Sequence, residues 1–216
     1  MPLIQYTLNT GDTLLNKNYH VVSHYLKYQL HPDNQYIEEY LEKLNSVIES
    51  ITNQYKRVLY IRFDLKFPKE FNYSDKVISE LFTKLKKRLL NKQYSQKHAH
   101  YFWVREKNNS INPHYHCALF LDYNKTHKTG FPAGKKAGGI MGLVNQLWCE
   151  ILNTDNTNLV YLCDSNLKYK FIDRSNPESK KLIFEHCAYL CKVRTKNFNL
   201  SGKNIGSSQV RIQNAI

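Results

Sequence analysis

The fold of this chain is decided by residues 104–122, VREKNNSINPHYHCALFLD. Aromatic and β-branched residues, which favour strands, flank a cluster of turn-forming residues at 108–113. This pattern predicts a β-hairpin with strands at 99–107 and 114–122. Any polar residues that alternate along these two strands will therefore lie side by side on one face of the hairpin.

Three such residues are Glu106, His114 and His116. If the hairpin closes just outside Glu106 and His114, their Cβ atoms lie about 4.5–5.5 Å apart, and His116 shares the face of His114. One carboxylate and two imidazoles then converge, a set that suits Mg²⁺ or Mn²⁺ and also tolerates Fe or Zn. Two histidines in this spacing are also common as solvent-facing polar residues. The carboxylate opposite them is what points to a metal.

The first strand of the hairpin carries other polar residues. His98 and His100 repeat the His-x-His form, but His100 and Glu106 are separated by roughly 20 Å of extended chain, too far to share an ion. We expect these two histidines at the surface or in contact with phosphate. Arg105 should point to the face opposite Glu106, where it can pair with an acid.

A second candidate group lies near the C-terminus. Asn176-Pro177-Glu178 has the form of a helix start, and the helical pattern runs to about Thr195. Helical phase places the apolar residues on one stripe, Ile183, Cys187 and Leu190. Tyr189, Lys192 and Lys196 fall on roughly the opposite side, so Tyr189 lies beside a cation. The alternative is a packing role, because the chain has 16 tyrosines.

The strand pair with Glu and His-x-His, followed by a Tyr-x-x-Lys helix, resembles the HUH endonuclease superfamily of rolling-circle replication initiators and relaxases. More narrowly, residues 104–122 and 188–196 resemble the inovirus-type initiators, which include the YagK/YfjJ-type proteins of bacterial prophages. The resemblance covers roughly residues 56–196. The middle of the histidine motif, usually bulky and apolar, is Tyr115 here. A third motif would fall near residues 61–65, where the match is loose and no catalytic role is carried over.

The resemblance implies a metal-dependent nickase that initiates replication on single-stranded or hairpin DNA at an origin. The metal, Mg²⁺ or Mn²⁺ on Glu106, His114 and His116, would polarise the scissile phosphate. Tyr189 would attack phosphorus, leaving a 5′-phosphotyrosine bond and a free 3′-hydroxyl, and the strand could later be rejoined. Lys192 would hold a phosphate oxygen or lower the pKa of the phenol. The chain has no helicase motif, so unwinding and synthesis would need a host helicase and polymerase.

Two other functions stay open on the residues alone. A non-covalent metal-dependent hydrolase or oxygenase would use the same triad and would not depend on Tyr189. A catalytically inactive nucleic-acid-binding protein would use neither group.

Composition agrees with a polyanionic partner. Thirty-one Lys and Arg against 18 Asp and Glu give a net charge of +13, and aromatic residues at 13% supply possible stacking surfaces for unpaired bases. The basic run at 84–88 is typical of a solvated helix face. The candidate DNA contacts are Lys135, Lys136, Arg194 and Lys196. Charge alone does not separate a nickase from other nucleic-acid-binding proteins.

The order of patterns predicts an α+β fold of HUH/Rep type, with a central antiparallel sheet of about five strands and helices on one face. Strands are expected at 57–67, 99–107, 114–122, 159–163 and 168–172, and helices at 74–92 and 140–152 and in the Tyr189 segment. Residues 1–55 read as a mostly helical N-terminal extension with a break at 31–34, residues 56–197 as the nickase domain, and residues 198–216 as a loosely ordered tail.

The remaining sequence signals concern location. No apolar stretch approaches 18 residues and no signal sequence is evident, so we expect a cytoplasmic protein of a bacterial host without membrane contact. The five cysteines are odd in number and scattered, which is typical of reduced thiols. The sequence does not indicate an oligomeric state.

Overall fold

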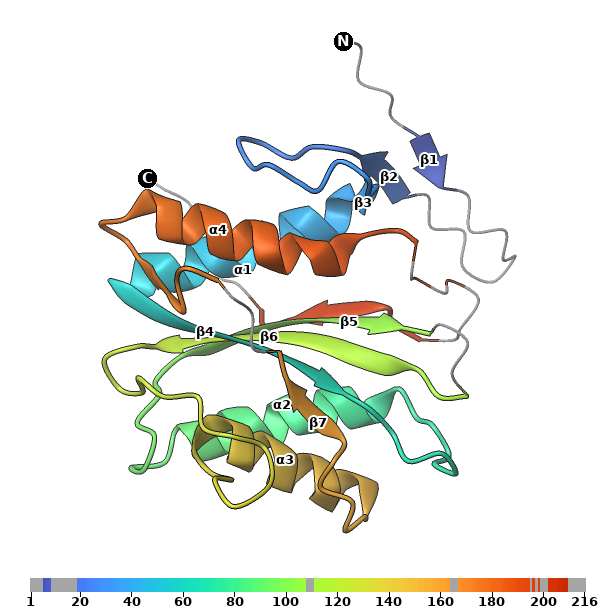
Figure 1. The fold of residues 1–216 in the computed structure, drawn as a ribbon, viewed down its shortest axis with the longest axis vertical. Coiled ribbons are helices and arrows are strands. Elements are labelled where there is room, and N and C mark those ends of the chain that lie inside the picture. Colours follow the sequence, from blue (N-terminus) through green and yellow to red (C-terminus); the bar gives the residue numbers. More distant parts are fainter. Residues whose placement is uncertain are drawn as a thin grey trace.

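A computed structural model describes residues 6–8, 19–107, 111–163, 167–194, 196, 198 and 202–209 of the chain. Its main feature is a six-stranded antiparallel sheet (Figure 1). The strands are β4 (Arg57–Leu65), β5 (Ala99–Glu106), β6 (His114–Asp122), β7 (Val160–Leu162), β8 (Phe171–Asp173) and β9 (Ile205–Ser207). The order of the strands is β7-β4-β6-β5-β9. β7 pairs with residues 63–65 of β4, and β8 pairs with residues 57–59 at the opposite end of the same strand. The predicted α+β class is confirmed.

The helices cover both faces of this sheet, so the prediction that they pack on one face is wrong. They are α1 (Glu38–Gln54), α2 (Lys76–Leu89), α3 (Gly139–Leu152) and α4 (Pro177–Ala188). Figure 1 shows α1 and α4 on one side and α2 and α3 on the other. No helix in the described part of the chain is long and apolar enough to cross a membrane. All five cysteines are free thiols, as expected.

The physical reason for two covered faces lies in the central strands. Residues 117–121 of β6 read CALFL, an unbroken apolar run that would expose hydrophobic side chains if one face were open to water. Cys117 and Leu119 join the core with α2 and α3, whereas Ala118 and Phe120 join the core with α1 and α4. Alternation along each strand thus supplies two separate cores.

The predicted hairpin is confirmed in its strands and its register. β5 and β6 agree with the expected ranges to within one residue, and they pair from Ala99 opposite Leu121 to Glu106 opposite His114. β6 also pairs with β4 along eight residues, so β6 lies at the centre of the sheet. The tip of the hairpin, residues 108–110, lies outside the described residues.

The N-terminal segment differs from its prediction. Among residues 6–8 and 19–55, the part of this segment that the structure describes, α1 is the only helix, whereas β1 (Tyr6–Leu8), β2 (Tyr19–Val22) and β3 (Tyr36–Ile37) form a small three-stranded sheet. The β-branched and aromatic residues at Val21-Val22 and Tyr36-Ile37 favour strands, and this short-range preference prevails over the weak helical pattern. The buried side of α1 shares one core with the central strands.

The C-terminal segment is also more ordered than its sequence predicts. Residues 205–207 of the expected loose tail form β9, which pairs with β5 and places Gly206 opposite Trp103. A Cβ atom at Gly206 would lie 2.4 Å from the indole, so only glycine permits this approach. Next to it, Ser208 Oγ lies 3.2 Å from Nδ1 of His100. His100 is therefore buried beneath the C-terminal segment, and the surface position expected for it is wrong.

The helix that leads to Tyr189 ends earlier than its pattern predicts. α4 stops at Ala188, and Tyr189–Cys191 continue as one turn of 3₁₀ helix. Lys192 is extended, and the N–H of Val193 donates to the carbonyl of Gln35 at 2.9 Å. The hydrogen bond from Val193 to Gln35, just before β3, thus replaces a further turn of α4. Thr195, the predicted helix end, lies outside the described residues.

We predict that Leu44→Ala lowers the free energy of unfolding by about 2–5 kcal/mol, because Leu44 on α1 is fully buried against the sheet. Urea denaturation followed by circular dichroism measures the change. The neighbouring exposed variant Lys43→Ala should stay within about 0.5 kcal/mol of the wild type. Equal stabilities for the two variants would show that α1 is not part of the cooperative core.

Candidate functional site

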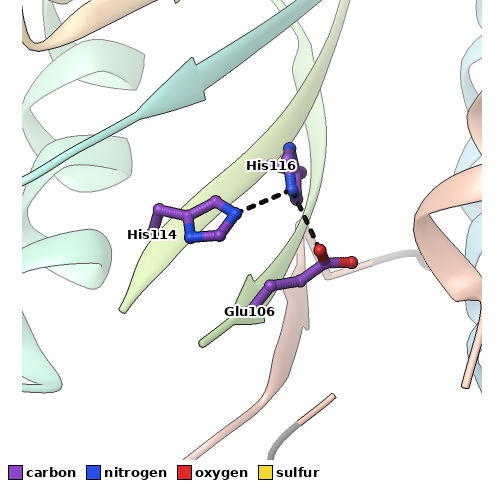
Figure 2. A group of neighbouring side chains, drawn as sticks. All are labelled: Glu106, His114 and His116. Carbon is purple, nitrogen blue, oxygen red and sulfur yellow. Dashed lines mark hydrogen bonds and ion pairs between the residues drawn. The ribbon is translucent and has the colours of Figure 1, made fainter. Parts of the chain in front are cut away.

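The structure brings the three predicted residues of the hairpin together at one end of the sheet. Nε2 of His116 lies 3.1 Å from Nε2 of His114 and 3.2 Å from Oε2 of Glu106. One potential ligand atom from each residue lies within 4.8 Å of the others. Figure 2 shows the three side chains pointing toward one another from β5 and β6. We refer to them below as the triad.

A fourth polar residue, Asp64, belongs to the site and was not selected from the sequence. Oδ1 of Asp64 lies 2.6 Å from Nδ1 of His116, and the two residues are register partners on β4 and β6. Asp64 lies in the loosely matching segment 61–65, to which no role was assigned. The signal that could have found it is a carboxylate inside a strand that is otherwise apolar or basic; the missing information was which strand pairs with β6.

The hydrogen-bonding pattern at His116 calls for a positive charge. A neutral imidazole that donates Nδ1–H to Asp64 has a lone pair on Nε2, and this lone pair faces Oε2 of Glu106. Both atoms are then hydrogen-bond acceptors, and they repel each other. A proton on Nε2 removes this repulsion: burial alone would lower the pKa of His116, but the bonds to Asp64 and Glu106 raise it above its ordinary value. A divalent metal satisfies the same lone pairs, and a carboxylate with two imidazoles is a suitable donor set.

Lys196 occupies a different place from the one its sequence pattern predicts. Its side chain is fully buried, and Nζ lies 2.6 Å from Oε1 of Glu106. Burial raises the pKa of Glu106, but the hydrogen bond from His116 and the charge of Lys196 hold it well below its ordinary value. Helical phase fails for Lys196 because the helix ends at Ala188. In this position the ammonium group forms an ion pair with Glu106 of the triad and is not exposed for contact with DNA.

Tyr189 lies at the end of α4 among three cations. Nζ of Lys192 is 3.6 Å from the centroid of its ring, and Nη2 of Arg194 donates to its hydroxyl at 3.5 Å. The guanidinium carbon of Arg62 on β4 is 5.7 Å from the ring centroid. Hydrogen bonds from Lys192 and Arg194 lower the pKa of Tyr189 below its ordinary value. The predicted pairing of Tyr189 with Lys192 is present, although the two residues are not on one α-helix.

Strand β4 relates Tyr189 to the triad. Arg62 and Asp64 are two residues apart, roughly 6–7 Å along the strand, and share a face. Asp64 binds His116, whereas Arg62 contacts Tyr189. The tyrosine and the triad therefore lie on the face of the sheet that α1 and α4 cover, and they flank the same end of β4.

The opposite face explains the residue between the two histidines. Tyr115 points away from the triad, is buried, and its hydroxyl lies 2.8 Å from that of Tyr73. Arg105 donates to Tyr73 at 2.8 Å and forms an ion pair with Asp75, as predicted for its face. A tyrosine fits the middle position because its hydroxyl finds partners beneath the sheet, and these contacts fix β5 and β6 under the triad.

The other candidate DNA contacts are divided between two regions. Arg194 is exposed beside Tyr189. Lys135 and Lys136 are exposed in the loop between β6 and α3, which leaves β6 at the end away from His114 and lies on the α3 side (Figure 1). The structure does not bring these two lysines to the triad.

Comparison with known proteins gives a family match over most of the chain. The model of the YagK/YfjJ C-terminal domain family matches residues 13–208. The chain is also similar to the protein "Uncharacterized protein YagK" of Escherichia coli (strain K12). The two are 25% identical over 201 residues, which cover 82% of this chain and 95% of that protein. No solved structure matches.

We predict that the protein binds Mn²⁺ and that Glu106→Ala abolishes this binding, because the variant removes the only carboxylate of the triad. Binding should weaken as the pH falls through the pKa of His116, raised above its ordinary ~6.5, since the metal must displace a proton. Electron paramagnetic resonance of free Mn²⁺ measures both effects.

Two control variants sharpen this measurement. Asp64→Asn keeps the shape of the partner of His116 but removes its charge, and should weaken Mn²⁺ binding roughly 10–100-fold. His98→Ala, at an exposed position away from the triad, should leave the affinity unchanged. Mn²⁺ binding that survives Glu106→Ala would place the metal elsewhere.

Proposed function

Since the chain belongs to the YagK/YfjJ C-terminal domain family, we propose that it is a metal-dependent nickase of single-stranded DNA within the HUH endonuclease superfamily. In this proposal it initiates rolling-circle replication through a covalent 5′-phosphotyrosine bond. One observation carries the proposal: a tyrosine among three cations shares a sheet face with a carboxylate and two histidines.

The triad would hold the metal. A divalent cation bound by Glu106, His114 and His116 supplies positive charge that polarises a phosphate oxygen. Asp64 fixes His116 through Nδ1, so that Nε2 is directed at the ligand position. Lys196 binds the second oxygen of Glu106 and leaves Oε2 directed at His116.

Tyr189 would supply the nucleophile. Its lowered pKa raises the fraction of phenolate at neutral pH, with the phenol proton released to solvent. The phenolate oxygen bonds to phosphorus, and the bond to the 3′ oxygen breaks; that oxygen takes up a proton and becomes the free 3′-hydroxyl. Lys192 and Arg194 stabilise the negative charge on the phosphate. The phosphotyrosine bond retains the energy needed to rejoin the strand without ATP.

The surroundings of Tyr189 favour this proposal over a non-covalent hydrolase. A hydrolase that activates water at the triad has no use for three cations around a phenol, whereas a phenolate nucleophile needs them. Position 185 is Glu and position 193 is Val, so no second tyrosine lies one turn from Tyr189. Completion of a replication round would then need a second subunit or another tyrosine, together with a host helicase and polymerase in the bacterial cytoplasm.

We predict that Tyr189→Phe abolishes a protein–DNA adduct while DNA binding survives, because the variant removes one oxygen atom and keeps the ring among its cations. The wild type is incubated with Mn²⁺ and labelled single-stranded oligonucleotides from its own replication origin. An SDS gel then separates adduct from free protein.

The controls for this gel are chemical and structural. EDTA should remove the adduct from the wild type. Tyr161→Phe, at another exposed tyrosine, should leave it intact. An adduct that persists in Tyr189→Phe moves the nucleophile to another residue, and turnover without any adduct favours the hydrolase.

We predict that Lys192→Met slows nicking roughly 100-fold at neutral pH, as expected for loss of one charge-stabilising donor. The rate should rise with pH as Tyr189 ionises, and the midpoint should move up toward the ordinary tyrosine pKa of about 10 when the cation is removed. Lys192→Arg should keep the wild-type midpoint. An unchanged pH profile in Lys192→Met would reduce Lys192 to a packing residue.

A further inference from the structure

A cavity of about 380 Å³ opens along the edge of β4, beside the site already described. β7 pairs with residues 63–65 of β4 and β8 with residues 57–59, so residues 60–62 lie in the gap between these two short strands. The loop at 127–131, together with Leu167 and Lys170, forms its other walls. The volume falls at the lower end of the roughly 300–1,000 Å³ of small-molecule sites.

The chemistry of the cavity is apolar inside and basic at the rim. The lining includes Leu59, Ile61, Leu162 and Leu167, and Phe131 exposes 52% of its surface beside it. Arg62, Lys128 and Lys170 contribute positive charge, and none of the described lining residues is acidic. The cavity thus suits a group with an apolar face attached to a negatively charged one.

Arg62 connects this cavity to Tyr189. It lines the cavity, and its guanidinium carbon is also 5.7 Å from the centroid of the Tyr189 ring. Nη1 of Arg62 lies 3.2 Å from Nε2 of His186, while Nε is buried and has no hydrogen-bond partner among the described residues. Arg62 is therefore shared between the wall of the cavity and the cations around Tyr189.

We propose that this cavity receives one unpaired nucleobase of the DNA strand whose phosphate lies at Tyr189. The proposal rests on the proposed function and adds where the enzyme holds a base of its substrate. The flat faces of the base lie against Phe131 and the leucine residues of the lining, while its polar edges stay toward the open side, and the flanking phosphates meet Lys128 and Lys170. A paired base is stacked inside a duplex and cannot enter, so the cavity selects single strands.

The test compares two strands with the same phosphates. One is fluorescein-labelled dT12, and the other is a twelve-residue abasic strand; fluorescence anisotropy gives their affinities for the wild type in EDTA, where no adduct forms. The proposal predicts that dT12 binds roughly tenfold more tightly, as one stacked base contributes. Leu162→Trp, which fills the cavity, should abolish this preference and leave the affinity for the abasic strand unchanged.

Two further comparisons do not depend on a filled cavity. Phe131→Ala, at an exposed position, should lower the preference for dT12 about fivefold. The double variant Lys128→Glu/Lys170→Glu should weaken binding of both strands at least tenfold more than Lys125→Glu/Lys168→Glu. The second pair has the same change in charge and lies on the same two segments, but does not line the cavity. Circular dichroism verifies that each variant is folded.

The outcomes separate this proposal from the proposed function. A preference for dT12 that survives both Leu162→Trp and Phe131→Ala, or that is lost in Tyr161→Ala instead, overturns the cavity as the base site. If the cavity proposal fails in this way but the adduct at Tyr189 forms, the proposed nickase function still stands. Conversely, a cavity-dependent preference without any adduct supports the base site and contradicts the nickase.

Discussion

The pairing of β6 with both β4 and β5 is the constraint on which the site depends. It places Asp64 and Glu106, which are distant in sequence, on either side of His116. Because strand side chains alternate, a slip of one residue in either ladder would turn these carboxylates to the opposite face and into the core of α2 and α3. Such a slip is unfavourable because it would bury charged side chains in an apolar core, so the cores that stabilise the fold also set the geometry of the triad.

Buried charge is concentrated at one end of the sheet, and its arrangement fits a binding site better than a stabilising device. Glu106 and Lys196 are almost fully buried, and removing such groups from water costs several kcal/mol per ion, which close pairing only partly offsets. The negative charges of Asp64 and Glu106 converge on one imidazole. An apolar set of residues would stabilise this corner of the fold at lower cost, and this unfavourable burial of charge supports the proposed metal site.

Much of the fold and the site could be predicted from local pattern, and the failures share a cause. The hairpin and its three polar residues follow from alternation and a turn cluster. Asp64 could not be selected, because its role depends on which strand pairs with β6. The end of α4 was misplaced because contacts of Val193 with Gln35 compete with the helix. β9 has only three residues and contains a glycine, so its strand character comes from β5 and not from its own sequence.

β9 also has a consequence for the solution behaviour of the protein. It covers part of the outer edge of β5, a strand whose sequence AHYFWVRE is rich in aromatic residues. An uncovered edge of this kind pairs readily with a strand from another molecule. A form of the protein cut before residue 205 would present that edge, and it would aggregate more readily even if every residue of the triad were unchanged. β9 thus shields the edge of β5 from pairing with other molecules, although β9 contributes no residue to the triad.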